Sequence, residues 1–276
     1  MGSRSSLSPH ALLRLASEQR ELESKEIHPL VLSGARRPAS VLARELSRAA
    51  VPGSVVQDEE FGQAEALVYL LRGRPKSDDL RRLREAGRAR VPIICVRIGG
   101  DTGPLPSVLA TDIIELESTE PVPIEEIGRL LARRLEGRAA ALVARIPALR
   151  GGVCRELIQH SARRSAAVGA TSFARAPDLP ALFLEQARLI LWLGHAHDRR
   201  LEPKRGAELA AVLMTGLGLR RLARRVRHET FIPAWAMQGS IAYAGTLALG
   251  EAALRYFSGD GNELGSSSSD RVQAPA

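Results

Sequence analysis

The chain has 276 residues, 45% of them hydrophobic, and carries 39 basic against 31 acidic side chains for a net charge of +8. A chain of this length and apolar content can bury a core large enough for two domains, which excludes disorder throughout. The net charge favours partners that carry phosphate, either an anionic bilayer or nucleic acid, although an arginine-biased genome would give the same balance. Two isolated cysteines exclude a disulfide framework and predict a reducing compartment.

Apolar runs alternate with amphipathic stretches through the first half of the chain. Residues 1–26 are expected to form a polar leading segment with a solvent-facing helix. Strands are then expected at 27–32, 51–57, 64–71, 91–96 and 111–116, and helices at 38–50, 77–89 and 124–145. This alternation predicts an α/β domain over residues 27–148, with a Rossmann-like parallel sheet covered by helices.

The strand signal stops after residue 146. Helices are expected at 153–170, 179–196, 203–214, 219–228 and 233–257, and the serine-bearing segment 258–276 is typical of a disordered tail. The second half is therefore predicted to be an all-α helical domain over residues 149–257.

Residues 31–41, at the first strand-to-helix junction, look like a phosphate-binding loop that has lost its functional side chains. Counting from Gly34, Ala39 replaces the second glycine, Ser40 the lysine and Val41 the serine or threonine. The junction therefore lacks the charge that contacts the β- and γ-phosphates and the hydroxyl that binds Mg²⁺. We expect no cofactor, with Gly34, Arg36 and Arg37 left as vestigial contacts to a phosphate.

The segment from the 64–71 strand through the 77–89 helix to the 91–96 strand resembles the middle of an Era-like small G domain. In that family the last of these strands leads into an Asn-Lys-x-Asp motif that recognises guanine. Here residues 97–101 are Arg-Ile-Gly-Gly-Asp, and only Asp101 matches. The Asp-x-x-Gly switch motif is represented by Glu59-Glu60-Phe61-Gly62, and the nearest aspartate, Asp58, lies one residue early. The resemblance implies a degenerate G-domain-like fold over residues 27–148, and an unrelated doubly wound domain is the alternative.

The second half resembles the YcjF-like helical domain of unknown function. The resemblance is carried, in this order, by residues 180–192, 205–209, 215–220, 232–235 and 244–256. Such a domain often follows an Era-like G domain in bacterial membrane-associated proteins. The resemblance implies a location at the cytoplasmic face of the inner membrane, peripheral or integral, and it supplies no catalytic residue.

Two neighbouring segments near the C-terminus fit a membrane surface. Residues 231–250 contain no charged side chain, close to the ~20 residues needed to cross a bilayer, but proline, glutamine and glycine make insertion marginal. The arginines of 220–228 precede this segment and suit an anionic leaflet, where each cation contributes about 1 kcal/mol. The candidate membrane-associated residues are Arg220, Arg221, Arg224, Arg225, Trp235, Gly239, Tyr243 and Gly245.

A soluble helical bundle explains the same segments equally well. The arginines would then form a solvated face of one helix. Ser240, Ala244 and Ala248, at four-residue spacing, would give a small-residue face for close helix packing in either setting.

His195, His197 and Asp198 are a group of metal-ligand residue types on one helix. Residues two apart do not share a helix face, and a third ligand is not evident nearby in the sequence. We therefore expect no metal site, and a helix C-terminus with cationic and capping residues is the better explanation.

These patterns together favour a non-catalytic, membrane-associated, pseudo-GTPase-like protein. Its α/β domain would be an interaction module, and its YcjF-like helices would dock on inner-membrane lipid or a membrane protein, with homo-oligomerisation left open. One alternative is a divergent GTP-binding hydrolase that uses backbone N–H groups at residues 33–38 with Arg36 or Arg37. The other is a soluble, cytoplasmic, arginine-rich adaptor for nucleic acid. Aromatic residues make up only 4% and none interleaves with the basic run, which argues against single-stranded nucleic acid.

Overall fold

The computed structural model describes Ser17, Arg20 and residues 27–58, 61–99, 103–118, 122–171, 179–199 and 234–259. The chain divides into two compact units, Ser24–Glu156 and Leu157–Ala276 together with Met1–Glu23. The first unit is α/β and the described part of the second is helical, so the predicted fold class is confirmed. The division lies within helix α6 (Arg150–Thr171), later in the chain than the expected boundary between residues 148 and 149.

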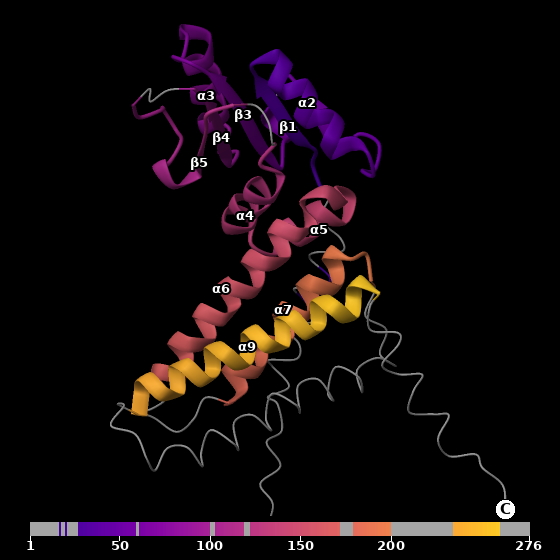
Figure 1. Cartoon of the computed structure of the whole chain (residues 1–276), viewed down its shortest axis with the longest axis vertical. Coiled ribbons are helices and arrows are strands. Elements are labelled where there is room, and N and C mark those ends of the chain that lie inside the picture. The colour runs from indigo at the N-terminus through magenta and orange to yellow at the C-terminus, as the bar shows by residue number, and fades with distance from the viewer. Residues whose placement is uncertain are drawn as a thin grey trace, which may run out of the picture. The chain divides into compact units, whose positions relative to one another are not determined.

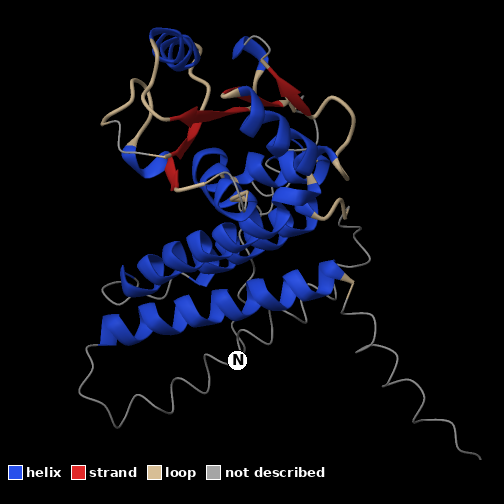
Figure 2. Cartoon of the chain, turned by 45° about the horizontal axis from the view of Figure 1, so that its top comes forward, coloured by secondary structure: helices blue, strands red, loops and turns tan. Residues whose placement is uncertain are grey.

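The first unit is built on a five-stranded parallel sheet with the strand order β2-β1-β3-β4-β5 (Figures 1 and 2). The strands are β1 (Leu30–Gly34), β2 (Val55–Gln57), β3 (Ala66–Arg72), β4 (Ile93–Ile98) and β5 (Ile113–Leu116). Gly34 at the end of β1 lies opposite Leu70 of β3. All residues of β4 and all but the last of β3 are buried, as expected for parallel strands covered by helices on both faces.

Helices α2 (Arg36–Ser47) and α3 (Ser77–Arg88) flank the sheet (Figure 1). The crossover through α2 winds from β1 outward to β2, and the crossover through α3 winds the other way, from β3 to β4. Because such crossovers are right-handed, the two helices cover opposite faces. The α3 side holds a hydrophobic cluster that includes Val31, Tyr69, Leu83 and Cys95. The described parts of the other connections contain only short 3₁₀ turns, η1 (Phe61–Gln63) and η2 (Ala110–Asp112).

The prediction of one long helix over residues 124–145 is wrong. The chain forms two helices, α4 (Ile124–Leu135) and α5 (Gly137–Arg145), followed by the 3₁₀ turn η3 (Pro147–Leu149). Glu136 separates the helices with φ 48° and ψ −123°. An L-residue adopts positive φ only at a cost, so the redirection of the chain here is imposed by packing and not by the preference of Glu136.

The described part of the second unit consists of α7 (Leu179–Ala196), α9 (Ala234–Ser258) and the part of α6 from Leu157 onward. Glycines let α6 and α9 approach closely. A Cβ added at Gly239 would lie 3.2 Å from the Ala166 carbonyl oxygen, and one at Gly250 would lie 2.7 Å from Ile158 Cγ1. α7 occupies the residues predicted for it and contacts α9 through a hydrogen bond from Gln186 Nε2 to Thr246 Oγ1 at 3.4 Å.

The small-residue face predicted for the last helix is wrong. Ser240, Ala244 and Ala248 are exposed, whereas the neighbouring face is buried. The buried face comprises Gly239, Ala242, Thr246, Leu249, Gly250, Ala253 and Phe257. This face combines small residues with larger apolar ones, so it gains both close approach and buried apolar area.

None of the described helices contains an 18-residue stretch apolar enough to cross a membrane. The expected helices at 203–214 and 219–228 lie outside the described residues, as do the tail from residue 260 and nearly all of the leading segment.

Candidate functional site

The sheet has a topological switch point between β1 and β3. The chain winds outward from β1 to β2 on one side and from β3 to β4 and β5 on the other. In doubly wound folds, ligands bind outside the carboxyl ends of the strands at this point. Here that place is where β1 ends at Gly34 and β3 ends at Arg72.

The connection from β1 to α2 is closed tightly by the backbone. A single residue, Ala35, joins the strand to the helix, and its N–H donates to the Leu70 carbonyl at 2.8 Å. Gly34 has φ +103°, and a Cβ at this position would overlap the Leu70 carbonyl oxygen. Residues 36–38, expected in a phosphate loop, form the first turn of α2 instead. Ala39 N–H bonds to the Ala35 carbonyl at 3.0 Å and Pro38 has no N–H, so this turn offers an anion at most the backbone donors of Arg36 and Arg37.

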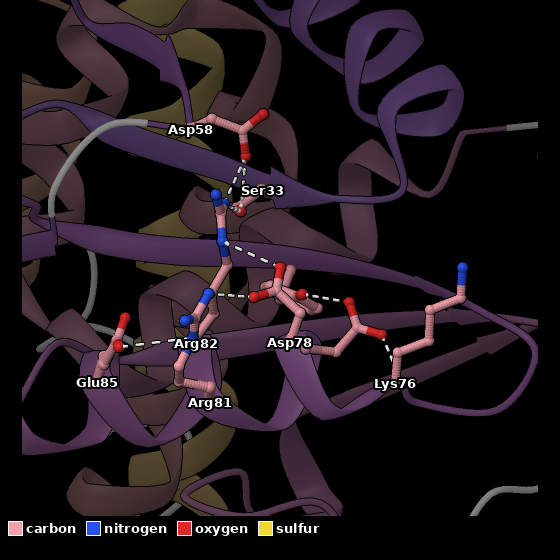
Figure 3. Close-up of polar contacts among 9 residues, drawn as sticks. Ser33, Asp58, Lys76, Asp78, Arg81, Arg82 and Glu85 are labelled. Atoms are coloured by element: carbon pink, nitrogen blue, oxygen red, sulfur yellow. Dashed lines mark hydrogen bonds and ion pairs between the residues drawn. The ribbon is translucent and has the colours of Figure 1, made fainter.

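A buried serine ties β1 to the residue that follows β2 and to helix α3 (Figure 3). Ser33, in β1, is fully buried, and its hydroxyl donates to Asp58 Oδ1 at 2.8 Å. Arg82 Nη1, from α3, donates to Ser33 Oγ at 2.7 Å and to Asp58 Oδ1 at 2.8 Å. Asp58 directly follows β2 with φ 53°, which turns its carboxylate back toward Ser33. The Ser33–Asp58–Arg82 cluster therefore satisfies its own charge and hydrogen bonds at the end of β1.

A second polar contact fixes the start of α3. Tyr69, buried in β3, donates its hydroxyl hydrogen to Asp79 Oδ1 at 2.6 Å. The other oxygen of Asp79 accepts the Lys76 backbone N–H at 2.7 Å. Burial and the hydrogen bond to the Asp79 carboxylate raise the pKa of Tyr69, so the phenol stays protonated. Tyr69 thus acts as a structural donor that holds the helix start against the sheet.

Five cations surround the switch point, and we call them the basic rim. They are Arg36 and Arg37 at the start of α2, Arg72 at the end of β3, and Arg74 and Lys76 between β3 and α3. All five are exposed. Among the described residues, none of their side chains has a carboxylate within ion-pair distance, whereas Arg81 and Arg82 of α3 are both paired. Within the described part of the chain, the basic rim therefore carries positive charge without a carboxylate partner at the carboxyl edge of the sheet.

The structure brings together some of the residues that the sequence singled out. Gly34, Arg36 and Arg37 lie side by side at the end of β1. Asp101 lies outside the described residues, and so do Arg220, Arg221, Arg224 and Arg225. On α9, Trp235 and Tyr243 are 56% and 36% exposed, Gly239 packs against α6, and a Cβ at Gly245 would meet nothing within 4 Å.

The sequence interpretation missed the cluster that occupies the switch point. Ser33, Asp58 and Arg82 come from three segments, and neither their spacing nor their types form a known motif. One signal was present: Ser33 and Asp58 are polar residues at the carboxyl ends of predicted strands, which meet at one edge of a parallel sheet.

No metal or thiol chemistry is evident in the described part of the chain. No group of three His, Cys, Asp or Glu residues within it could hold a metal ion. Nδ1 of His197 lies 2.9 Å from the Leu193 carbonyl oxygen, and the His197 ring stacks on Phe257. Burial raises the pKa of both Cys95 and Cys154 to about 12, so neither is a reactive thiolate near neutral pH.

The chain matches no protein-family profile and no curated protein.

Proposed function

We propose that this protein is a non-catalytic interaction module that associates with a membrane surface. In this proposal the α/β unit is a pseudo-GTPase-like domain whose nucleotide site no longer works. The helical unit is YcjF-like and docks peripherally on the cytoplasmic face of the inner membrane. Inner-membrane lipid or a membrane protein is the partner.

The closed connection between β1 and α2 carries the first half of the proposal. A nucleotide needs a wide backbone turn whose N–H groups surround its phosphates. Ala35 is the whole of that turn here, and its N–H is already bonded to Leu70. The neighbouring Ser33 hydroxyl is bonded to Asp58, so it has no hydrogen left to donate to a phosphate.

The charge distribution supports the second half of the proposal. The chain carries a net charge of +8, and the arginines of 220–228 immediately precede the charge-free residues 231–250. Juxtaposed basic and apolar segments suit the headgroup region of an anionic leaflet. Exposed Trp235 at the start of α9 is the kind of side chain that prefers this interface.

Nucleotide titration tests the absence of nucleotide chemistry. We expect isothermal titration of the full-length protein with GTP or ATP and Mg²⁺ to show no binding at millimolar nucleotide, and no phosphate release. Tight, Mg²⁺-dependent GTP binding would instead favour a divergent hydrolase. Such binding would have to be weakened by Arg36→Gln or Arg37→Gln, since the guanidinium groups of these residues are exposed beside the open backbone N–H groups of α2.

Fractionation of the native host tests the membrane association. We expect the protein in the membrane fraction at low salt, with partial release as salt is raised, because screening weakens peripheral charge contacts. Recovery wholly in the soluble fraction at moderate salt would contradict the proposal. Tight, salt-dependent binding to nucleic acid would favour the adaptor alternative instead.

A further inference from the structure

We propose that the basic rim is a docking surface for anionic phospholipid headgroups, so that the α/β unit itself contacts the membrane. This inference rests on the proposed membrane association and adds a second contact site, distant in sequence from the helices near the C-terminus. It assigns Arg36, Arg37, Arg72, Arg74 and Lys76 to that site.

The basic rim is held in place by ordered backbone. Gly73 has φ +69°, and its N–H donates to the Ile98 carbonyl at 3.0 Å, which anchors the turn after β3. The ring of Pro75 fixes the φ angle of Pro75 itself, and the Asp79 carboxylate accepts the backbone N–H of Lys76. Arg72, Arg74 and Lys76 are therefore presented at two-residue intervals from a fixed turn. Gly34 and Leu70 pair across β1 and β3, which brings Arg36 and Arg37 beside this turn.

The charge of the basic rim is not neutralised by the acidic residues nearest to it in sequence. Asp79 is bonded to Tyr69 and to the backbone of Lys76. Asp78 pairs with Arg81 and lies 4.0 Å from Arg82 Nε, within α3 (Figure 3). Since these carboxylates are occupied inside the domain, the five exposed cations have no carboxylate partner among the residues that the structure describes.

The arrangement of the basic rim favours a membrane surface over a single bound phosphate as its ligand. One phosphate is bound tightly when several N–H groups converge on it, and the one-residue turn at Ala35 provides no such cradle. Exposed cations spread over two adjacent turns instead match many weakly held phosphates in one plane. Each cation near an anionic leaflet strengthens binding roughly fivefold.

The neighbouring strand ends favour lipid over nucleic acid. Along the carboxyl edge of the sheet, exposed Glu117 follows β5 on one side of the basic rim. A duplex has fixed phosphate spacing, so one that crossed the rim along this edge would place phosphates against this carboxylate. Lipid headgroups are mobile and can gather under the cations alone. The rim also contains no aromatic side chain on which bases could stack.

Vesicle co-sedimentation of the full-length protein tests the inference. We expect binding to phosphatidylcholine vesicles that contain phosphatidylserine and much weaker binding to phosphatidylcholine alone. The triple substitution Arg72→Gln, Arg74→Gln, Lys76→Gln should lower the partition coefficient about 100-fold. The single substitution Arg74→Gln should lower it about fivefold, and it provides the test should the triple variant not fold.

Two control variants separate the rim from net charge. The first control is the triple substitution Arg44→Gln, Arg84→Gln, Arg88→Gln, which removes the same charge from exposed helix positions outside the rim. Because these positions lie away from the rim, this variant should change vesicle binding less than about fivefold. Arg72→Lys, Arg74→Lys should bind like the wild type, because a fluid headgroup layer responds to charge and not to the planar fork of arginine.

Several outcomes would overturn the inference. Equal losses in the two triple variants would show a general charge effect. Undiminished vesicle binding by the variant Arg72→Gln, Arg74→Gln, Lys76→Gln would show that the basic rim does not bind lipid, and it would leave the proposed membrane association intact. Wild-type protein that ignores anionic vesicles would refute both. Tighter binding to a short DNA duplex than to vesicles at the same salt, lost in the rim triple, would assign the surface to nucleic acid.

Discussion

The two connections that leave the sheet at its switch point are built in opposite ways. Between β1 and α2, one residue makes the turn and Gly34 lies directly against the Leu70 carbonyl. Between β3 and α3 the chain uses residues 73–76, and a Cβ on Gly73 would meet nothing within 4 Å. The first turn is fixed by close backbone packing, and the second by hydrogen bonds that leave its side chains free. Only the second can vary in sequence without disturbing the sheet. It carries two of the five rim cations, and a third, Arg72, directly precedes it at the end of β3.

Substitution of Gly34 and of Gly73 is expected to give the largest difference in the free energy of unfolding between these connections. Gly34→Ala combines positive φ with overlap on the backbone of β3, and we expect a loss of about 4 kcal/mol in the free energy of unfolding. Gly73→Ala meets only the cost of positive φ, about 1 kcal/mol. Urea unfolding followed by circular dichroism measures both. Equal losses would show that the two turns are not held differently.

Ser33→Ala tests whether the cluster at the end of β1 stabilises the closed connection. The substitution removes the hydroxyl that bridges Asp58 and Arg82, and we expect a loss of about 1.5 kcal/mol in urea unfolding. Ser40→Ala is the matched control, since the Ser40 hydroxyl is exposed and bonds only the Arg37 carbonyl among its described contacts. A loss at Ser40 as large as that at Ser33 would contradict a special role for the cluster.

Tyr69→Phe tests the contact that fixes the second connection. Removal of the hydrogen bond to Asp79 should cost about 1 kcal/mol at neutral pH. Because the folded state raises the pKa of Tyr69, the unfolded chain ionises first, near pH 10. Stability from this group is therefore complete below about pH 10 and falls as the pH rises further. The variant should lose less stability between pH 9 and pH 11 than the wild type, measured by urea unfolding at each pH; an identical alkaline loss would exclude Tyr69 as its source.

The exposed cations of the second connection should matter least for folding. Arg72→Gln, Arg74→Gln should change the free energy of unfolding by less than about 0.5 kcal/mol, because neither side chain is buried or paired in the described structure. Thermal unfolding measures this directly. A substantial destabilisation would mean that the basic rim supports the fold and is not a surface kept for binding.

Most of the architecture was predictable because it depends on local hydrophobic periodicity. Buried parallel strands are continuous apolar runs, so β3 and β4 were found within two residues of their true ends. α7 was placed correctly because its apolar residues recur over its whole length. The face of α9 was predicted wrongly because several rows of small residues run along that helix, and only tertiary packing selects one of them.

The junctions were less predictable because they depend on contacts between distant segments. The end of β1 at Gly34 is fixed by pairing with Leu70, which no local pattern reveals. At the break between α4 and α5 the sequence offers Gly137, yet positive φ falls on Glu136. The Ser33–Asp58–Arg82 cluster joins residues 25 and 49 positions apart from Ser33, so it could not be recognised before the strands were placed.

The direct passage from Gly34 into α2 limits how this domain could acquire a phosphate-binding loop. Introducing the side chains of a phosphate-binding loop by Ala39→Gly, Ser40→Lys and Val41→Ser would put them on a helix that has already begun at Arg36. Ala39 is moreover buried in the core, where its replacement weakens the helix packing. A phosphate-binding loop would therefore require added residues between Gly34 and Arg36, a change of chain length that point substitution alone does not supply.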